Sequence, residues 1–156
     1  MESMVGFGYG IQYSGLGFSR LPIALRYSFE IMQEAWQHSL ALFNSARFFE
    51  AHEALEDLWR EAPSSAPLRR HLQGLVQLSV AFHHQSTGNL AGASSVLERA
   101  VRNLEGGEES FPELDFARLR ADLSVWSRCF NEKLRNAKTS TSFPALPQLL
   151  LRAKLL

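Results

Sequence analysis

Residues 48–59 hold side chains whose types and spacing are suited to chemistry. They read Phe-Phe-Glu-Ala-His-Glu-Ala-Leu-Glu-Asp-Leu-Trp. Successive residues of a helix turn by about 100°, so His52 and Glu56 lie on one arc together with apolar residues of the segment. We therefore predict that this imidazole and this carboxylate point inward.

The third predicted helical segment, at about residues 67–85, is largely apolar. A second polar stripe interrupts it. It consists of Gln73, Gln77 and His84. If the two segments form a helical hairpin, the two glutamines lie at the same height as His52 and Glu56. The spacing therefore predicts one internal hydrogen-bonded network of a carboxylate, an imidazole and two amides.

Buried polar groups without partners cost several kcal/mol, so these four side chains should satisfy one another or bind a ligand. In the first interpretation, Glu56 accepts hydrogen bonds from His52 and from one glutamine. The network then only holds the helices in register, and no function follows from it.

A divalent metal is the second interpretation of the same cluster. His52 and Glu56 have the i, i+4 spacing of helical metal ligands, and His84, His83 or Glu53 supplies a further ligand. The function is then a metal-dependent hydrolase or lyase that uses His52 and Glu56. The pattern lacks the second histidine of zincin motifs and the Glu-x-x-His pair of di-iron bundles.

The third interpretation is a pocket for a small polar molecule or for a peptide of a protein partner, with aromatic side chains as its apolar wall. We favour this noncatalytic binding or interaction module, and we assign no catalytic and no cofactor-binding residue. The candidate site consists of His52, Glu53, Glu56, Trp59, Gln73, Gln77 and His84.

Apolar residues at steps of three and four predict the helices that position this site. They place helices at about 22–44, 47–61 and 67–85, a fourth from Asn89, and a fifth after a capping-box pattern that begins at Ser110. The fold class is therefore an all-α, single-domain bundle of about five helices. Its second and third helices form a central antiparallel hairpin.

The chain divides into three parts. Residues 1–21 read as a loose N-terminal extension, because five glycines interrupt them and their acidic start is unlike a signal peptide. Residues 22–137 form the helical domain. Residues 138–156 are a C-terminal tail, in which we consider a short docked helix at 147–155.

The composition narrows the classes of function. Among the 156 residues, 16 basic side chains balance 16 acidic ones, which argues against nucleic acid and anionic membranes as partners. No apolar run reaches the roughly 20 residues that cross a bilayer. The lone Cys129 forms no internal disulfide, so we expect a cytoplasmic protein. Apolar area that remains exposed on the first or fifth helix could support a homodimer, so the sequence does not determine the oligomeric state.

Three ordered blocks of the sequence resemble one protein family. The first contains Phe43-Asn44, then Phe48-Phe49-Glu50-Ala51-His52-Glu53, then Leu55-Glu56 and Trp59; the second is Gln-Gly-Leu-Val-Gln-Leu at residues 73–78; the third is Gly88-Asn89 followed by Gly92-Ala93. These blocks are similar to a family of small all-helical bacterial and archaeal proteins known as domain of unknown function 309. The resemblance spans about residues 43–104.

The resemblance implies an all-helical fold and a motif centred on residues 52–59. The family has no established activity, so the resemblance transfers no catalytic role. Two positions depart from the family pattern. Ala46 stands where a glycine is usual, and Ser79 stands where an alanine is usual.

Overall fold

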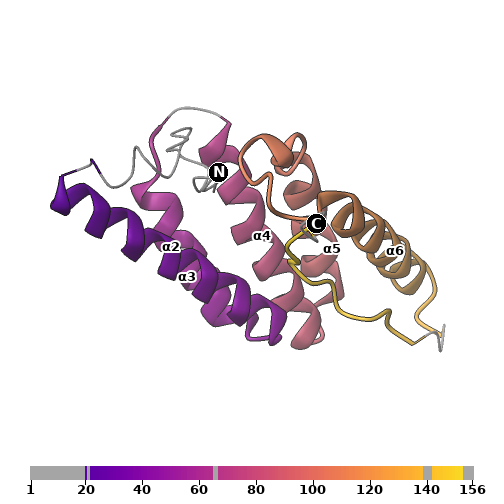
Figure 1. Cartoon of the computed structure of the whole chain (residues 1–156). Coiled ribbons are helices and arrows are strands. Elements are labelled where there is room, and N and C mark those ends of the chain that lie inside the picture. Colours follow the sequence, from indigo (N-terminus) through magenta and orange to yellow (C-terminus); the bar gives the residue numbers. More distant parts are fainter. Residues whose placement is uncertain (1–19, 21, 65–66, 139–141, 153–156) are drawn as a thin grey trace.

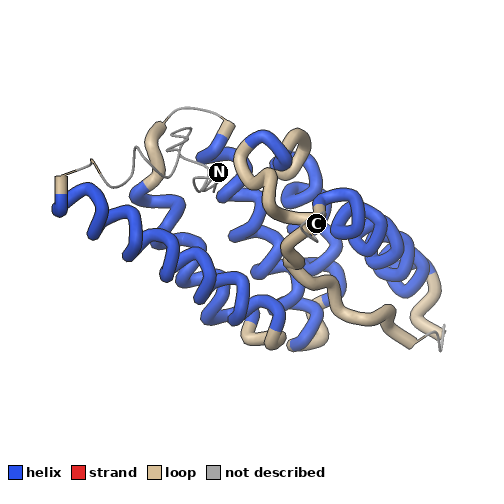
Figure 2. Tube along the Cα trace, in the orientation of Figure 1, coloured by secondary structure: helices blue, strands red, loops and turns tan. Residues whose placement is uncertain are grey.

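The chain is described by a computed structural model, which covers residues 20, 22–64, 67–138 and 142–152. Within these residues it forms five α-helices, one short 3-10 helix and no strand (Figures 1 and 2). The predicted loose extension at residues 1–21 lies outside the described residues except at position 20. The helices are α2 (Ile23–Asn44), α3 (Phe48–Glu61), α4 (Leu68–Ser86), α5 (Leu90–Asn103), η1 (Gly107–Glu109) and α6 (Phe116–Arg135).

Each helix packs against the next helix of the chain, as the row of helices in Figure 1 shows. The α3–α4 pair is antiparallel. Phe49 at the start of α3 lies beside His83 at the end of α4, and Trp59 near the end of α3 lies beside Arg69 at the start of α4. The prediction of an all-α bundle of five helices is confirmed. None of the described helices combines the length and the apolarity that a membrane span requires.

An aromatic cluster forms the centre of the core. Phe43 of α2 packs edge-on against Phe48 of α3, with ring centroids 5.2 Å apart, and Phe82 of α4 packs edge-on against Trp126 of α6 at 5.0 Å. Edge-to-face pairs add to the stabilisation that burial of the rings provides. The apolar stripes of four helices thus meet in one core.

Close contact between α4 and α5 depends on Gly74. A Cβ atom at this position would lie 2.7 Å from Cγ of Leu104 and 3.2 Å from the carbonyl carbon of Asn103. The first distance is too short for carbon atoms that are not bonded to each other, and the second is a tight contact. The absence of a side chain at Gly74 therefore allows the two helices to approach.

The turn between α2 and α3 contains a left-handed alanine. Helix α2 ends at Asn44, as the sequence predicts, and Ala46 then adopts φ = 60°. This conformation is unfavourable for a residue with a Cβ atom and free of that penalty for glycine. The glycine that the resemblance leads us to expect at this position would adopt this conformation without that penalty.

Helix α6 does not begin at the predicted capping box. Its N-cap is Asp115, whose carboxylate accepts a hydrogen bond from the Arg118 backbone N–H at 3.1 Å. Phe111 and Leu114 are buried, so residues 110–114 pack into the core and do not continue as a helix. Ser110 is itself buried and bonds to a side chain of α4.

The tail does not form the predicted helix over its described part. Residues 142–152 are extended and return to the loop before α6 (Figure 1, yellow). Proline does not explain this difference, because Pro147 would stand at the first position of the predicted helix, where its missing N–H is not needed. The backbone groups instead bond to other segments, from Asp115 N to Leu150 O at 2.9 Å and from Arg152 N to Glu113 O at 2.7 Å.

Candidate functional site

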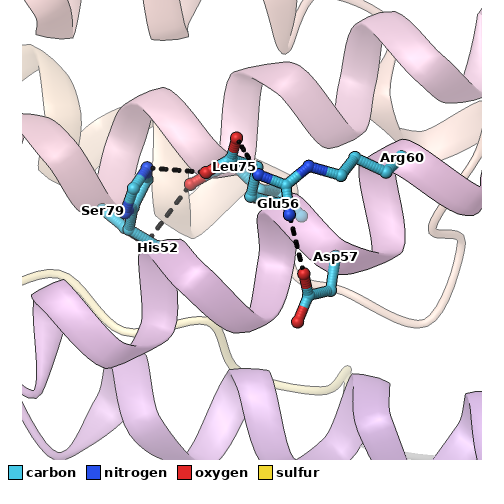
Figure 3. A network of polar contacts seen from close by, with 6 residues as sticks. All are labelled: His52, Glu56, Asp57, Arg60, Leu75 and Ser79. Carbon is cyan, nitrogen blue, oxygen red and sulfur yellow. Dashed lines mark hydrogen bonds and ion pairs between the residues drawn. The ribbon is translucent and has the colours of Figure 1, made fainter.

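The helical period of α3 places His52 and Glu56 at the edge of the core. Phe48, Ala51 and Leu55 are buried on the inner side of the helix. The side chains of His52 and Glu56 are 27% and 32% exposed, with 3.3 Å between Nε2 and Oε2 (Figure 3). The predicted pairing of these two groups is present, but they lie at the surface of the α3–α4 pair and not in its interior.

Glu56 continues this contact into a chain of ion pairs along α3. Its Oε1 accepts from Nη2 of Arg60 at 2.8 Å, and Nη1 of Arg60 donates to Oδ1 of Asp57 at 3.0 Å (Figure 3). Such exposed pairs at i, i+3 and i, i+4 contribute a few tenths of a kcal/mol each, about 0.2–0.5. The Glu56 carboxylate is therefore shared between an imidazole and a guanidinium of its own helix.

Gln73 and Gln77 do not join His52 and Glu56, contrary to the prediction. Gln77 accepts a hydrogen bond through Oε1 from Nδ2 of Asn103 in α5, at 2.8 Å, and Gln73 is exposed. Helix α4 is apolar almost all round, so its sequence does not determine how the helix is rotated about its own axis. The structure turns the glutamine stripe away from the α3 carboxylate.

The proposed metal ligands are not assembled. Nδ1 of His84 lies 3.3 Å from Nδ2 of Asn89, the residue that caps α5. Across the described ranges 22–64, 67–138 and 142–152, no three His, Cys, Asp or Glu side chains come together in a way that would hold a metal ion. The structure therefore keeps only the pair of His52 and Glu56 from the predicted ligand set.

Trp59 is partly buried under a cation. The guanidinium carbon of Arg69 lies 4.3 Å from the centre of the indole ring, and Nη1 of Arg69 donates to the Ala62 carbonyl at 3.1 Å. The buried Nε1 of Trp59 has no hydrogen-bond partner among the described residues. Arg69 thus covers the ring where the pocket interpretation required an open cleft.

Phe49 is the exposed aromatic residue of this region. Its side chain is 52% exposed, and its ring centroid lies 6.2 Å from that of His52 and 5.6 Å from that of His83. Glu53, one turn further along α3, is exposed as well. We call Phe49, His52, Glu53 and His83 the α3 edge.

The most completely buried polar site escaped the sequence analysis. His71 of α4 has no exposed surface, and its Nδ1 lies 2.6 Å from Oγ of Ser110. Its Nε2 lies 2.8 Å from the Glu105 carbonyl. A carbonyl only accepts, so Nε2 carries the hydrogen and the Ser110 hydroxyl donates to Nδ1. Burial lowers the pKa of His71, although the bond to Glu105 opposes this effect.

One signal for His71 was present in the sequence. It falls three residues after Leu68 and four before Leu75, on a face of α4 that is otherwise apolar. Its burial could have been inferred from this position. Its partner could not, because Ser110 lies 39 residues away in an irregular segment.

A cavity lies between α5 and α6, two helices away from α3. It encloses about 580 Å³, and charged side chains that include Arg102 and Arg128 stand among its lining residues. Its apolar lining comprises Leu97, Val101, Leu104, Phe116, Leu119 and Leu123. No motif of the sequence pointed to this cavity.

The described residues form a small all-helical protein whose three sequence blocks run from the end of α2 to the start of α5. Residues 36–96 match the model of the family described as Domain of unknown function (DUF309). The predicted resemblance to this family is therefore confirmed for that segment.

Two relatives are similar to part of the chain. The uncharacterized protein YpuF of Bacillus subtilis (strain 168) is 34% identical over 82 residues, which are 52% of this chain and 47% of that protein. An uncharacterized protein of Aquifex aeolicus (strain VF5) is 26% identical over 94 residues, which are 60% of this chain and 27% of that protein. The chain thus matches less than half of the length of either relative.

Proposed function

We propose that this chain is a noncatalytic interaction module that binds a protein partner through the α3 edge. The partner contributes a segment with an apolar side chain and a basic side chain. The observation that carries the proposal is the half-exposed ring of Phe49. Aromatic side chains of this kind supply much of the binding energy of protein interfaces.

The charge of α3 supports a basic partner. Among its 14 residues the helix carries five carboxylates and one arginine. Glu50 is paired with Arg47 at 3.2 Å, and Arg60 forms ion pairs with both Glu56 and Asp57. None of the ion pairs within the described part of the chain includes Glu53. Its carboxylate, one turn from Phe49, is therefore suited to receive a lysine or arginine of the partner.

The two histidines of the α3 edge serve as polar contacts in this proposal. His52 is held by Glu56, whose other oxygen bonds to Arg60. His83 belongs to α4 and packs against the Phe49 ring of α3. In this proposal the partner binds without movement of the backbone. The ion pairs of Glu56 with His52 and Arg60 restrict these side chains before the partner binds.

We place this interaction in the cytoplasm. Cys129 is a free, buried thiol, and it is the sole cysteine of the chain. A chain without disulfides is typical of a reducing compartment.

Affinity capture with matched variants tests the proposal. The immobilised full chain is compared with Phe49→Ser, Glu53→Lys and the control Val125→Ser, which removes an apolar side chain that is 42% exposed on α6. We expect one partner to bind the original chain and the control, and to bind both α3-edge variants at least tenfold more weakly. The purified partner must then reproduce these differences in a direct titration. Equal capture by all four proteins would contradict the proposal.

A further inference from the structure

The extended tail is held by a side chain that recognises backbone. Nδ2 of Asn44 donates to the Leu149 carbonyl at 3.0 Å, and Oδ1 of Asn44 accepts from the Leu149 N–H at 2.7 Å. The amide therefore satisfies both main-chain polar groups of one extended residue. Such a contact selects an extended conformation and is independent of the side chain at that position.

Two further contacts fix the tail along the same surface. Nε1 of Trp126 donates to the Ala145 carbonyl at 2.9 Å. The Phe143 ring stacks on Trp126 with 5.6 Å between ring centroids and 19° between planes, and Nζ of Lys133 lies 4.6 Å from the Phe143 ring centre. Asn44, Trp126 and Lys133 thus form what we call the tail-binding surface.

Over residues 146–149 the side chains of the tail alternate between exposed and buried. Pro147 and Leu149 are buried, whereas Leu146 and Gln148 are exposed. Alternation with a period of two is how extended peptides are recognised, with main-chain bonds for affinity and every second side chain for specificity. The seated residues follow the pattern aromatic-x-x-x-Pro-x-Leu, from Phe143 to Leu149.

The tail and its main anchor belong to different parts of the chain. Asn44 lies within the segment that matches the family model, residues 36–96, whereas the tail at residues 142–152 lies outside it. The backbone-binding amide is thus a feature of the matched segment itself. The tail that this amide binds comes from outside the matched segment.

We propose that the tail-binding surface is a peptide-binding site, and that residues 142–149 occupy it as an internal ligand. The partner that fits is a protein segment in extended conformation with an aromatic residue, a proline and a leucine at the spacing of Phe143, Pro147 and Leu149. The internal tail competes at an effective concentration in the millimolar range, about 1 mM for a short connection. Partner binding is therefore coupled to release of the tail.

Fluorescence anisotropy with a labelled peptide tests this proposal. The peptide has the sequence of residues 142–152, and it is titrated with the full chain and with the full-chain variant Phe143→Ser/Leu149→Ser, whose own tail is weakened. We expect the weakened variant to bind the peptide at least tenfold more tightly than the original chain. Adding Asn44→Ala to the weakened variant should remove that gain.

Matched peptides and a second protein variant control the test. A peptide with Gln148→Ala should bind unchanged, because this side chain faces solvent, whereas a peptide with Leu149→Ser should lose binding. If the double variant does not fold, Phe143→Ser alone replaces it, since this side chain is 41% exposed, with an expected gain of about threefold. Phe49→Ser on the α3 edge should leave peptide binding unchanged, which separates this proposal from the previous one.

Two results would overturn the proposal. If the weakened variant binds the peptide no more tightly than the original chain, the tail is only a structural element. If the original chain is a dimer that Leu149→Ser dissociates, the surface receives the tail of a second copy and not a partner protein.

Discussion

His71 and Ser110 form a buried hydrogen bond between α4 and the segment that leads into α6, with 2.6 Å between Nδ1 and Oγ. The same imidazole donates to the Glu105 carbonyl just after α5. Arg70, the neighbour of His71, donates to the Arg102 and Glu105 carbonyls at 3.2 Å and 3.0 Å. These bonds hold the end of α5 and the following turn against α4.

Removing one partner of the His71–Ser110 bond should be costly. Ser110→Ala leaves Nδ1 buried without a donor, and we expect a loss of about 1–3 kcal/mol in the free energy of unfolding. His71→Leu should cost a similar amount, of order 1–3 kcal/mol, because it strands the Ser110 hydroxyl. Urea unfolding of both variants and of the double variant measures the coupling. The double variant should lose less than the two single losses combined, and simple additivity would contradict the bond.

His71 should also make the stability of the fold depend on pH. Its pKa in the folded state is lower than the ordinary value of 6.5, chiefly because of burial. Below pH 6.5 the unfolded chain therefore binds more protons than the folded chain, so stability should fall as the pH drops from 6.5 through the folded pKa. Urea unfolding between pH 5 and 8 tests this, and His71→Gln should reduce the slope in that window. An unchanged slope would assign the pH dependence to other groups.

Gly74→Ala should lower stability even though alanine is the better helix former. Its Cβ would press against Leu104 and the α5 backbone. Overpacking costs roughly 1–3 kcal/mol, against a gain of about 1 kcal/mol in helix propensity, so we expect a net loss of about 1 kcal/mol. Thermal unfolding measures the change. Leu104→Ala should cost less in the Gly74→Ala background, because it removes the side chain that the new Cβ meets.

Ala46→Gly should raise stability. A left-handed alanine is strained by roughly 1–2 kcal/mol, and the larger entropy of an unfolded glycine offsets about 0.4–1 kcal/mol of the relief. The expected net gain is about 0.5–1 kcal/mol in thermal unfolding. Ala121→Gly, at an exposed interior position of α6, is the control and should destabilise by about 1 kcal/mol. A loss at both positions would contradict the left-handed geometry.

The Glu108 carboxyl should titrate far below the ordinary pKa of a glutamate. Its hydrogen bonds with Arg120, one of them at 2.6 Å from Nη2 to Oε2, lower its pKa from 4.5 to about 2. The stability that the pair contributes is therefore present above pH 4.5 and is lost as the pH falls through 2. It is small because both side chains are largely exposed. In an NMR titration, Arg120→Gln should return the Glu108 midpoint toward 4.5, whereas Arg118→Gln should not move it.

Helix positions were predictable because their signals are local. Asn44 ends α2 and Asn89 caps α5 with a 2.9 Å bond to the Gly92 N–H, and both roles depend on residues only a few positions away. Periodic apolar residues likewise predict which face is buried in the helices that have a single apolar stripe. The five helices of the described residues therefore followed from the sequence.

The candidate site was harder to predict because it depends on how the helices are rotated and on distant partners. Gln77 faces α5 and not α3, since a helix that is apolar on nearly all sides has no unique inward direction. Ser110 resembled a helix cap because its local sequence fits one, but His71 bonds to it from 39 positions away. Ser79 is buried and donates to the Leu75 carbonyl at 3.2 Å, so its burial leaves no unpaired hydroxyl (Figure 3).

The bond between Asn44 and Leu149 joins residues 105 positions apart. A ribosome adds roughly 5–20 residues per second, so α2 leaves the exit tunnel several seconds before residues 142–152 do. During that interval α2 to α5 can pair with their sequence neighbours, while the surface that Leu149 covers is still bare. In our proposal, the Asn44 part of the tail-binding surface is therefore open to chaperones or partners on a nascent chain before the tail can compete for it.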